Sequence, residues 1–137
     1  MNPFQSLREY EEFIYSLSRG STIVESSTLV VVRRSRLLVI VEGELRLHGG
    51  YRLRVEEHLT LEYGSLRIDR YGYEIYRGAE KLYWYDSQPH PDNPDLASTH
   101  PHHKHVPPDI KHNRIVAPGL SFTRPNLPFL IAEIVET

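Results

Sequence analysis

The sequence contains no cysteine, and this absence excludes several kinds of protein. A disulfide framework, a thiol nucleophile and every thiolate metal site are ruled out. No stretch approaches the roughly 18 uninterrupted apolar residues of a membrane span, and the first residues lack the pattern of a signal peptide. We therefore expect a cytoplasmic protein without membrane association.

An excess of charge of one sign is also lacking, because 16 Lys and Arg residues face 18 Asp and Glu residues for a net charge of −2. This balance gives no overall indication of nucleic-acid binding. A chain of 137 residues, 39% of them apolar, is long enough to bury roughly two thirds of its unfolded surface in one core. We expect a single domain over residues 1–137.

Three abundant residue types are unevenly distributed along the chain. Seven of the nine tyrosines lie within residues 51–85, nine of the ten prolines follow residue 88, and six of the eight histidines lie within residues 90–112. This division predicts a regular scaffold over residues 1–88 and a His/Pro-rich functional loop over residues 89–124.

Hydrophobic periodicity predicts the elements of the scaffold. Apolar residues repeat at helical spacing between Asn2 and Gly20, with a capping-box pair at Ser6 and Glu9. The period then becomes two, and short turns allow only antiparallel neighbours. The expected strands are residues 23–32, 37–47, 51–63, 66–76 and 81–86, with a bulge or kink at residues 42–44. The predicted fold class is α+β: an N-terminal helix, an antiparallel meander of about five strands, the long His/Pro-rich loop and a closing helix over residues 125–137.

Glu57 breaks the alternation of the clearest strand. Its parity matches the apolar residues around it, so it points toward the apolar face unless a bulge at Glu56 and Glu57 moves it to the surface. Both alternatives remain open. An inward carboxylate must be paired with a cation or hold a raised pKa, and alternation in the next strand makes Arg70 its natural partner. Glu57 and Arg70 are candidate catalytic residues, although structural ion pairs are the commoner explanation.

The histidine-rich segment is the strongest functional feature. Its candidate catalytic residues are His90, His102, His103, Lys104 and His105. One histidine would accept a proton and another donate one, while a cation neutralises a phosphate. RNA cleavage without a metal cofactor requires these functions, because the ribose 2′-hydroxyl is itself the nucleophile. Residues 100–124 carry four Lys and Arg side chains against one Asp, a local charge of +3 that favours an anionic ligand.

A divalent-metal hydrolase is an alternative interpretation of the same segment. His102, His103 and His105 would be the ligands, and His103 and His105 point to the same side of an extended chain. A solvated loop without a chemical role is a third interpretation.

Aromatic and cationic residues beside this segment suggest how RNA would be bound. The candidate substrate-binding residues are Tyr83, Tyr85, Lys111, His112 and Arg114. The tyrosines could stack a base, while the cations contact phosphate. Cross-strand aromatic pairing that stabilises the sheet is the commoner reason for such a density of aromatic residues.

Four segments of the chain resemble the TumE family of toxin–antitoxin modules. They are Tyr51–His58, Asp69–Tyr73, Tyr83–Asp86 with Pro89-His90, and Pro101–His105, all within residues 35–106. The most specific part is an aromatic-Asp strand end followed by the Pro-His-His-Lys-His string. The resemblance implies a small cytoplasmic prokaryotic toxin, encoded beside an antitoxin, with ribonuclease activity. The tail Val106–Pro128 departs from the resemblance and leaves a subgroup without toxic activity open.

The sequence therefore favours a toxin that acts as a metal-independent endoribonuclease, with RNA and a cognate antitoxin as its partners. A non-enzymatic module that docks an antitoxin or another subunit is the alternative from a different class. An uncovered edge strand of the sheet would make a homodimer plausible.

Overall fold

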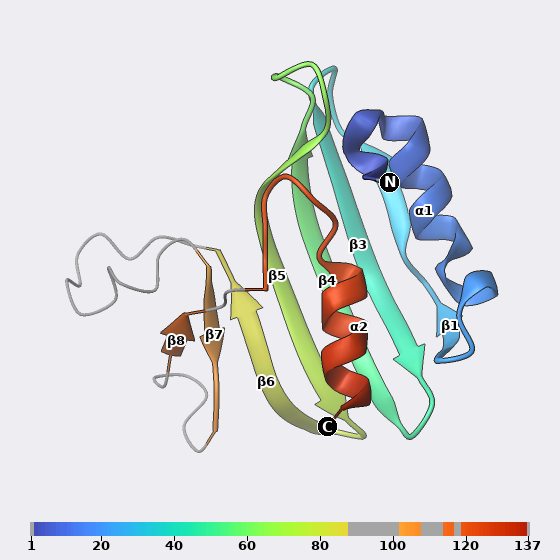
Figure 1. Cartoon of the computed structure of the whole chain (residues 1–137), viewed down its shortest axis with the longest axis vertical. Helices are drawn as coiled ribbons and strands as arrows, with labels where there is room; N and C mark the ends of the chain where they lie inside the picture. The colour runs from blue at the N-terminus through green and yellow to red at the C-terminus, as the bar shows by residue number, and fades with distance from the viewer. Residues whose placement is uncertain (1, 88–101, 108–113, 117–118, 137) are drawn as a thin grey trace.

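The computed structural model describes residues 2–87, 102–107, 114–116 and 119–136. Along the chain it forms η1 (Pro3–Gln5), α1 (Leu7–Gly20), β1 (Val24–Ser27), β2 (Val30–Arg33), β3 (Leu38–Leu47), β4 (Tyr51–Thr60), β5 (Arg67–Arg77), β6 (Glu80–Asp86), β7 (His103–His105), β8 (Arg114–Val116) and α2 (Leu127–Val135). One antiparallel sheet has the order β1-β3-β4-β5-β6-β7-β8, and β2 also pairs with β3 (Figure 1). The predicted α+β fold is confirmed.

The first helix begins later than the sequence suggested. Asn2 caps the short helix η1 by accepting a hydrogen bond from the Phe4 amide at 3.0 Å. Ser6 is extended and caps α1 by accepting from the Glu9 amide at 3.2 Å. The serine of the expected capping box therefore starts a new helix, because its extended backbone interrupts the helix predicted from Asn2.

The strand predicted over residues 23–32 is divided into β1 and β2, which pair with different parts of β3. The division lies opposite Gly43, whose φ is 140° and whose missing Cβ would lie 2.6 Å from the Thr28 carbonyl oxygen. The Glu44 amide donates to Thr28 Oγ1 at 2.9 Å. The expected irregularity is thus a close backbone approach on one side of β3, since the register between β3 and β4 is continuous.

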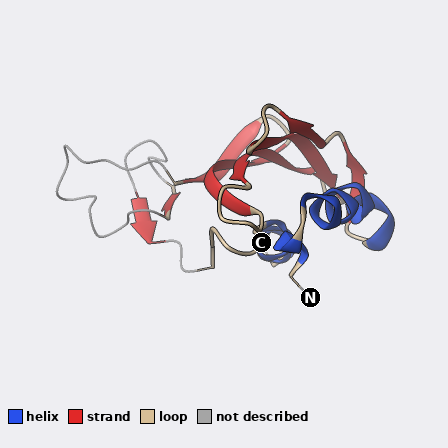
Figure 2. Cartoon of the chain, turned by 90° about the horizontal axis from the view of Figure 1, so that it is seen from above, coloured by secondary structure: helices blue, strands red, loops and turns tan. Residues whose placement is uncertain are grey.

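Both helices cover the same face of the sheet (Figure 2). Helix α1 lies beside β1, and α2 lies over the middle strands (Figure 1). The predicted closing helix is present as α2, which buries Leu127, Leu130, Ile131 and Ile134. Among the described residues, no helix covers the opposite face, and no helix is long and apolar enough to cross a membrane.

A buried carboxylate links both helices to the sheet. Glu57 pairs with Tyr71 without a bulge at this point and is fully buried. Its two oxygens accept hydrogen bonds from the hydroxyls of Tyr10 in α1 and Tyr73 in β5. Asn126, which precedes α2, donates to the Tyr73 hydroxyl at 3.1 Å. Burial raises the pKa of Glu57, although its bonds with both tyrosines act in the opposite direction.

Replacing Glu57 by Gln should weaken a pH dependence of stability. The unfolded chain releases this proton near pH 4.3, whereas the folded protein holds it to a higher pH. Raising the pH above about 4.3 therefore lowers the free energy of unfolding, by at most about 1.4 kcal/mol per pH unit, until the folded pKa is passed. Chemical denaturation across this range should show a shallower decline in E57Q than in the wild type. The exposed-site control Glu62→Gln should keep the wild-type slope, and equal slopes in all three proteins would contradict the prediction.

Candidate functional site

The face of the sheet opposite the helices carries a groove of about 550 Å³, which we call the open-face groove. It crosses β3, β4, β5 and β6, and Gly72 lies among its lining residues. The charged, imidazole and indole side chains that line it are Glu42, Arg54, Glu56, His58, Arg70, Glu74, Trp84 and Asp86.

Strand register brings these side chains together. Glu56 on β4 and Asp86 on β6 both pair with Gly72, so the two carboxylates flank the glycine. His58 pairs with Arg70 two positions further along the same two strands. Residues two apart in a strand point to the same face, which places acid, base and cationic groups on one surface.

The open-face groove has a carboxylate–imidazole pair on each side. Nε2 of His58 lies 3.1 Å from Glu56 Oε2, and the His58 and Glu56 side chains are 15% and 61% exposed. On the other side, Nε2 of His105 lies 3.3 Å from Asp86 Oδ2, with the histidine fully buried and the aspartate side chain 14% exposed. In each pair one member holds the other in place, and Glu56 has the most exposed side chain of the four.

Trp84 completes the side of the groove formed by β6 and β7. Its ring stacks on the His105 ring with centroids 3.5 Å apart and planes 6° from parallel. The Lys81 ammonium group lies 4.8 Å from the centroid of the Trp84 ring. The stacking covers one face of the His105 ring, which is fully buried although it belongs to a short strand near the sheet edge.

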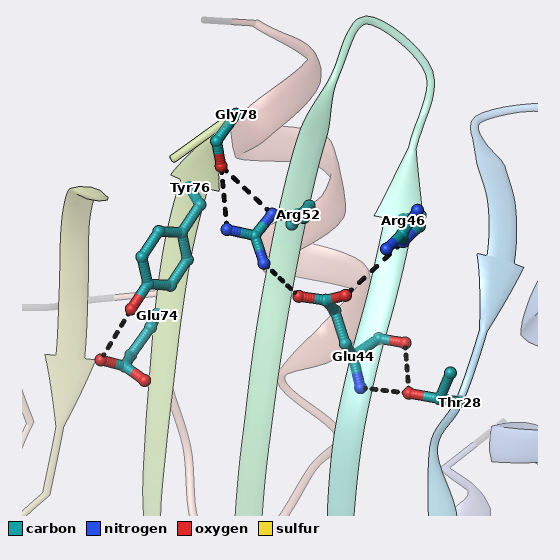
Figure 3. A network of polar contacts seen from close by, with 7 residues as sticks. All are labelled: Thr28, Glu44, Arg46, Arg52, Glu74, Tyr76 and Gly78. Atoms are coloured by element: carbon teal, nitrogen blue, oxygen red, sulfur yellow. Dashed lines mark hydrogen bonds and ion pairs between the residues drawn. The ribbon is translucent and has the colours of Figure 1, made fainter. Parts of the chain in front are cut away.

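At one end of the open face, charged side chains neutralise one another (Figure 3). Glu44 lies between Arg46 and Arg52, at 3.6 and 2.7 Å from their guanidinium nitrogens. Arg52 also donates two hydrogen bonds to the Gly78 carbonyl, at 3.2 and 2.8 Å. Glu74 is paired with Lys81 in the same way, so its charge is compensated at the groove.

On the opposite, helix-covered face, Lys104 of β7 contacts two tyrosines and α2. Its Nζ lies 4.4 and 5.3 Å from the ring centroids of Tyr83 and Tyr85, and 3.3 Å from Glu133 Oε2. The Tyr85 hydroxyl lies 2.7 Å from each Glu133 oxygen. Burial first, and then the bond to Glu133, raise the pKa of Tyr85. This cluster attaches β7 to the second helix.

His102 also lies on the helix-covered side. Its Nδ1 is 2.5 Å from the Tyr71 hydroxyl, and the two rings are stacked with centroids 5.6 Å apart. The Phe122 ring also packs against His102, with the two ring centroids 4.4 Å apart. Burial, and to a lesser extent the charge of Asp86, raise the pKa of Tyr71. The tyrosine therefore stays a hydrogen-bonding phenol at physiological pH.

Some of the predicted site residues lie close together in sequence and on neighbouring strands, but their side chains point to two different faces of the sheet. Strand β7 pairs with β6, which places the histidine string beside the aromatic strand. The alternation of β7 puts Lys104 on the helix side and His105 on the open side. Tyr83 and Tyr85 are buried, so their predicted base stacking is not supported by the geometry. His90, Lys111 and His112 lie outside the described residues, and His103 and Arg114 are placed only by their backbone.

The expected pairing of Glu57 with Arg70 is wrong. In β5 the register shifts so that His58 pairs with Arg70 but Leu59 pairs with Ile68, leaving Asp69 as an extra residue. This bulge turns Arg70 to the open face, where it is exposed. Glu57 remains on the helix side, and tyrosines take the place of the expected cation.

Sequence reasoning did not select Glu56, His58, Trp84 or Asp86 as site residues. Glu56 and His58 occupy polar positions of β4, and this alternation was the signal that could have placed both side chains on the open face. Arg70, the neighbour of His58 on β5, was selected for its expected pairing with Glu57 and not as a partner of His58. Among the described residues, no group of three His, Asp or Glu side chains is placed to hold a metal ion.

A family model described as Toxin TumE matches residues 12–137 of the chain. The chain belongs to the TumE toxin family. The resemblance drawn from four segments is therefore confirmed, and the matched range also includes the tail from residue 106 to residue 128. Comparisons with curated proteins and with solved structures give no match.

Replacing Lys104 by Ala should loosen β7 while leaving the rest of the sheet intact. The substitution removes the contacts with two tyrosine rings and the ion pair with Glu133, worth about 1 kcal/mol for a partly exposed cation. Hydrogen exchange should therefore quicken roughly fivefold at the β7 amides and remain unchanged in β4. The control Arg46→Ala removes an exposed ion pair elsewhere and should not affect β7. Unchanged exchange of β7 in K104A would refute this role.

Proposed function

We propose that this toxin-family protein cleaves RNA at the open-face groove without a metal ion, and that a cognate antitoxin is its partner. One observation carries the proposal. Strand register places the pairs Glu56–His58 and Asp86–His105 on either side of Gly72. Two separated acid–base groups on one surface are what cleavage of a phosphodiester by its own 2′-hydroxyl requires.

We assign the roles from the contact within each pair. Asp86 accepts the proton of the 2′-hydroxyl as its oxygen bonds to phosphorus, and His105 positions this carboxylate. His58 donates a proton to the 5′-oxygen as the bond from phosphorus to that oxygen breaks, and Glu56 positions the imidazole. The products are a 2′,3′-cyclic phosphate and a free 5′-hydroxyl, so atoms and protons balance.

Two arginines at the groove can contact a phosphate, although four carboxylates also line the groove. Arg70 is the cross-strand partner of His58, and Arg54 lies on the neighbouring strand. A guanidinium group at this position can stabilise the charge that develops on the phosphoryl oxygens.

Replacing His58 by Ala or Asp86 by Asn should each lower RNA cleavage in EDTA by roughly a hundredfold or more, because each removes one proton transfer. The readout is cleavage of a labelled RNA by purified protein, with the cyclic phosphate identified among the products. His48→Ala, an exposed histidine with a carboxylate at 3.9 Å, is the matched control and should retain full activity.

Cleavage that requires added Mn²⁺ or Zn²⁺ would instead support a metal hydrolase. Antitoxin binding by a protein that cleaves nothing would support a non-enzymatic module.

Replacing Arg70 by Ala should lower kcat by roughly a hundredfold with a smaller change in KM, because its donors act mainly on the charge of the transition state. Arg67→Ala is the control on the same strand, since Arg67 lies over the Tyr63 ring at 5.1 Å, away from His58. Equal kcat values for R70A and R67A would remove Arg70 from the catalytic site. A rise in KM alone would assign it to substrate binding.

A further inference from the structure

Gly72 occupies the middle of β5, where glycine weakens a strand because it supplies no side chain and is costly to order. Its φ is not positive, so its backbone conformation is open to other residues. A Cβ built on Gly72 meets no heavy atom within 4 Å among the described residues. Neither the backbone nor the packing of the described chain explains the glycine.

Gly43, on the neighbouring part of the sheet, is a glycine that the fold itself requires. Its φ is 140°, and a Cβ there would lie 2.6 Å from the Thr28 carbonyl oxygen. The chain itself excludes a side chain at Gly43, whereas it leaves space above Gly72. Gly72 lies in the floor of a groove, and neither its backbone conformation nor its packing requires a glycine. Such a glycine marks a place where a ligand approaches the backbone.

The two cross-strand neighbours of Gly72 determine which part of a nucleotide fits there. Glu56 and Asp86 flank it, and strand spacing puts their Cα atoms roughly 10 Å apart. A phosphate over Gly72 would lie between two carboxylates and be repelled. A flat base can lie on bare backbone, and its amino group can donate to a carboxylate oxygen.

We propose that Gly72 is the floor of a nucleobase subsite and that Glu56 reads the amino group of the base. The inference rests on the proposed function and names the nucleotide on the 5′ side of the scissile bond. Its base lies over Gly72, its 2′-hydroxyl faces Asp86, and its phosphate lies toward Arg70 and His58. One oxygen of Glu56 contacts His58, and the other accepts the hydrogen bond from the base.

This arrangement distinguishes bases by one group. Cytosine, adenine and guanine carry an exocyclic amino group, whereas uracil has a carbonyl oxygen in the place of the cytosine amine. A carboxylate accepts a hydrogen bond from the amine and repels the carbonyl oxygen. The subsite therefore prefers cytosine to uracil.

The test compares binding of short deoxycytidine and deoxyuridine oligonucleotides, which lack the 2′-hydroxyl and cannot be cleaved by the proposed route. The wild type should bind the cytosine oligonucleotide roughly tenfold more tightly. Gly72→Val should lose at least tenfold of that affinity because its side chain fills the floor, and Gly72→Ala should show a smaller loss. Glu56→Gln should make the two oligonucleotides bind alike.

Controls separate this inference from folding and from the proposed function. Thermal midpoints of G72A and G72V should equal or exceed that of the wild type, since the space above Gly72 is open. Gly20→Ala, at the end of α1 with nothing within 4 Å of its Cβ, should bind as the wild type does. If the wild type cleaves RNA and G72V binds and cleaves equally well, the subsite is refuted while the function stands. If the wild type neither cleaves RNA nor binds either oligonucleotide, the proposed function itself fails.

Discussion

The buried carboxylate of Glu57 is the constraint on which the rest of the structure depends. A carboxyl group removed from water is costly unless hydrogen-bond donors reach it, and here the donors come from Tyr10 and Tyr73. Tyr10 can do so only if α1 crosses the sheet at this point. Asn126, through Tyr73, sets where α2 begins. One polar network thus holds both helices on a single face and leaves the other face for the groove.

Strand alternation turns that constraint into a functional arrangement. With Glu57 fixed toward the helices, Glu56 and His58 must point to the open face. The bulge at Asp69 then brings Arg70 to the same side, whereas an unbroken register would direct its guanidinium group into the core. The same strands therefore carry the folding network on one side and the acid–base groups on the other, separated by one residue.

The hairpins were predictable because glycine turns and period-two patterns are local signals. The parity of Glu57 indicated an inward position but left a bulge at Glu56 and Glu57 open. The position of Arg70 was not predicted, because the alternation was followed from Leu66 and Ile68. The change of parity to Tyr71 and Tyr73 is the local signal of the bulge at Asp69. Strand β7 was hidden for a different reason: a three-residue strand is too short to show a period. Because β7 was not predicted, the Pro-His-His-Lys-His string was interpreted as a single cluster. Pairing of β7 with β6 divides its side chains between two faces.

This division gives β7 a structural meaning that a cluster would not have. On one face Lys104 connects the strand to Glu133 of α2, and on the other His105 stacks on Trp84 and contacts Asp86. A three-residue strand forms few backbone hydrogen bonds, so these side chains supply much of what keeps it in place. The surroundings of Asp86 therefore exist only while β7 is docked. The helix-side contacts of Lys104 and the chemistry of the open face are coupled through this strand, although they lie on opposite sides of the sheet.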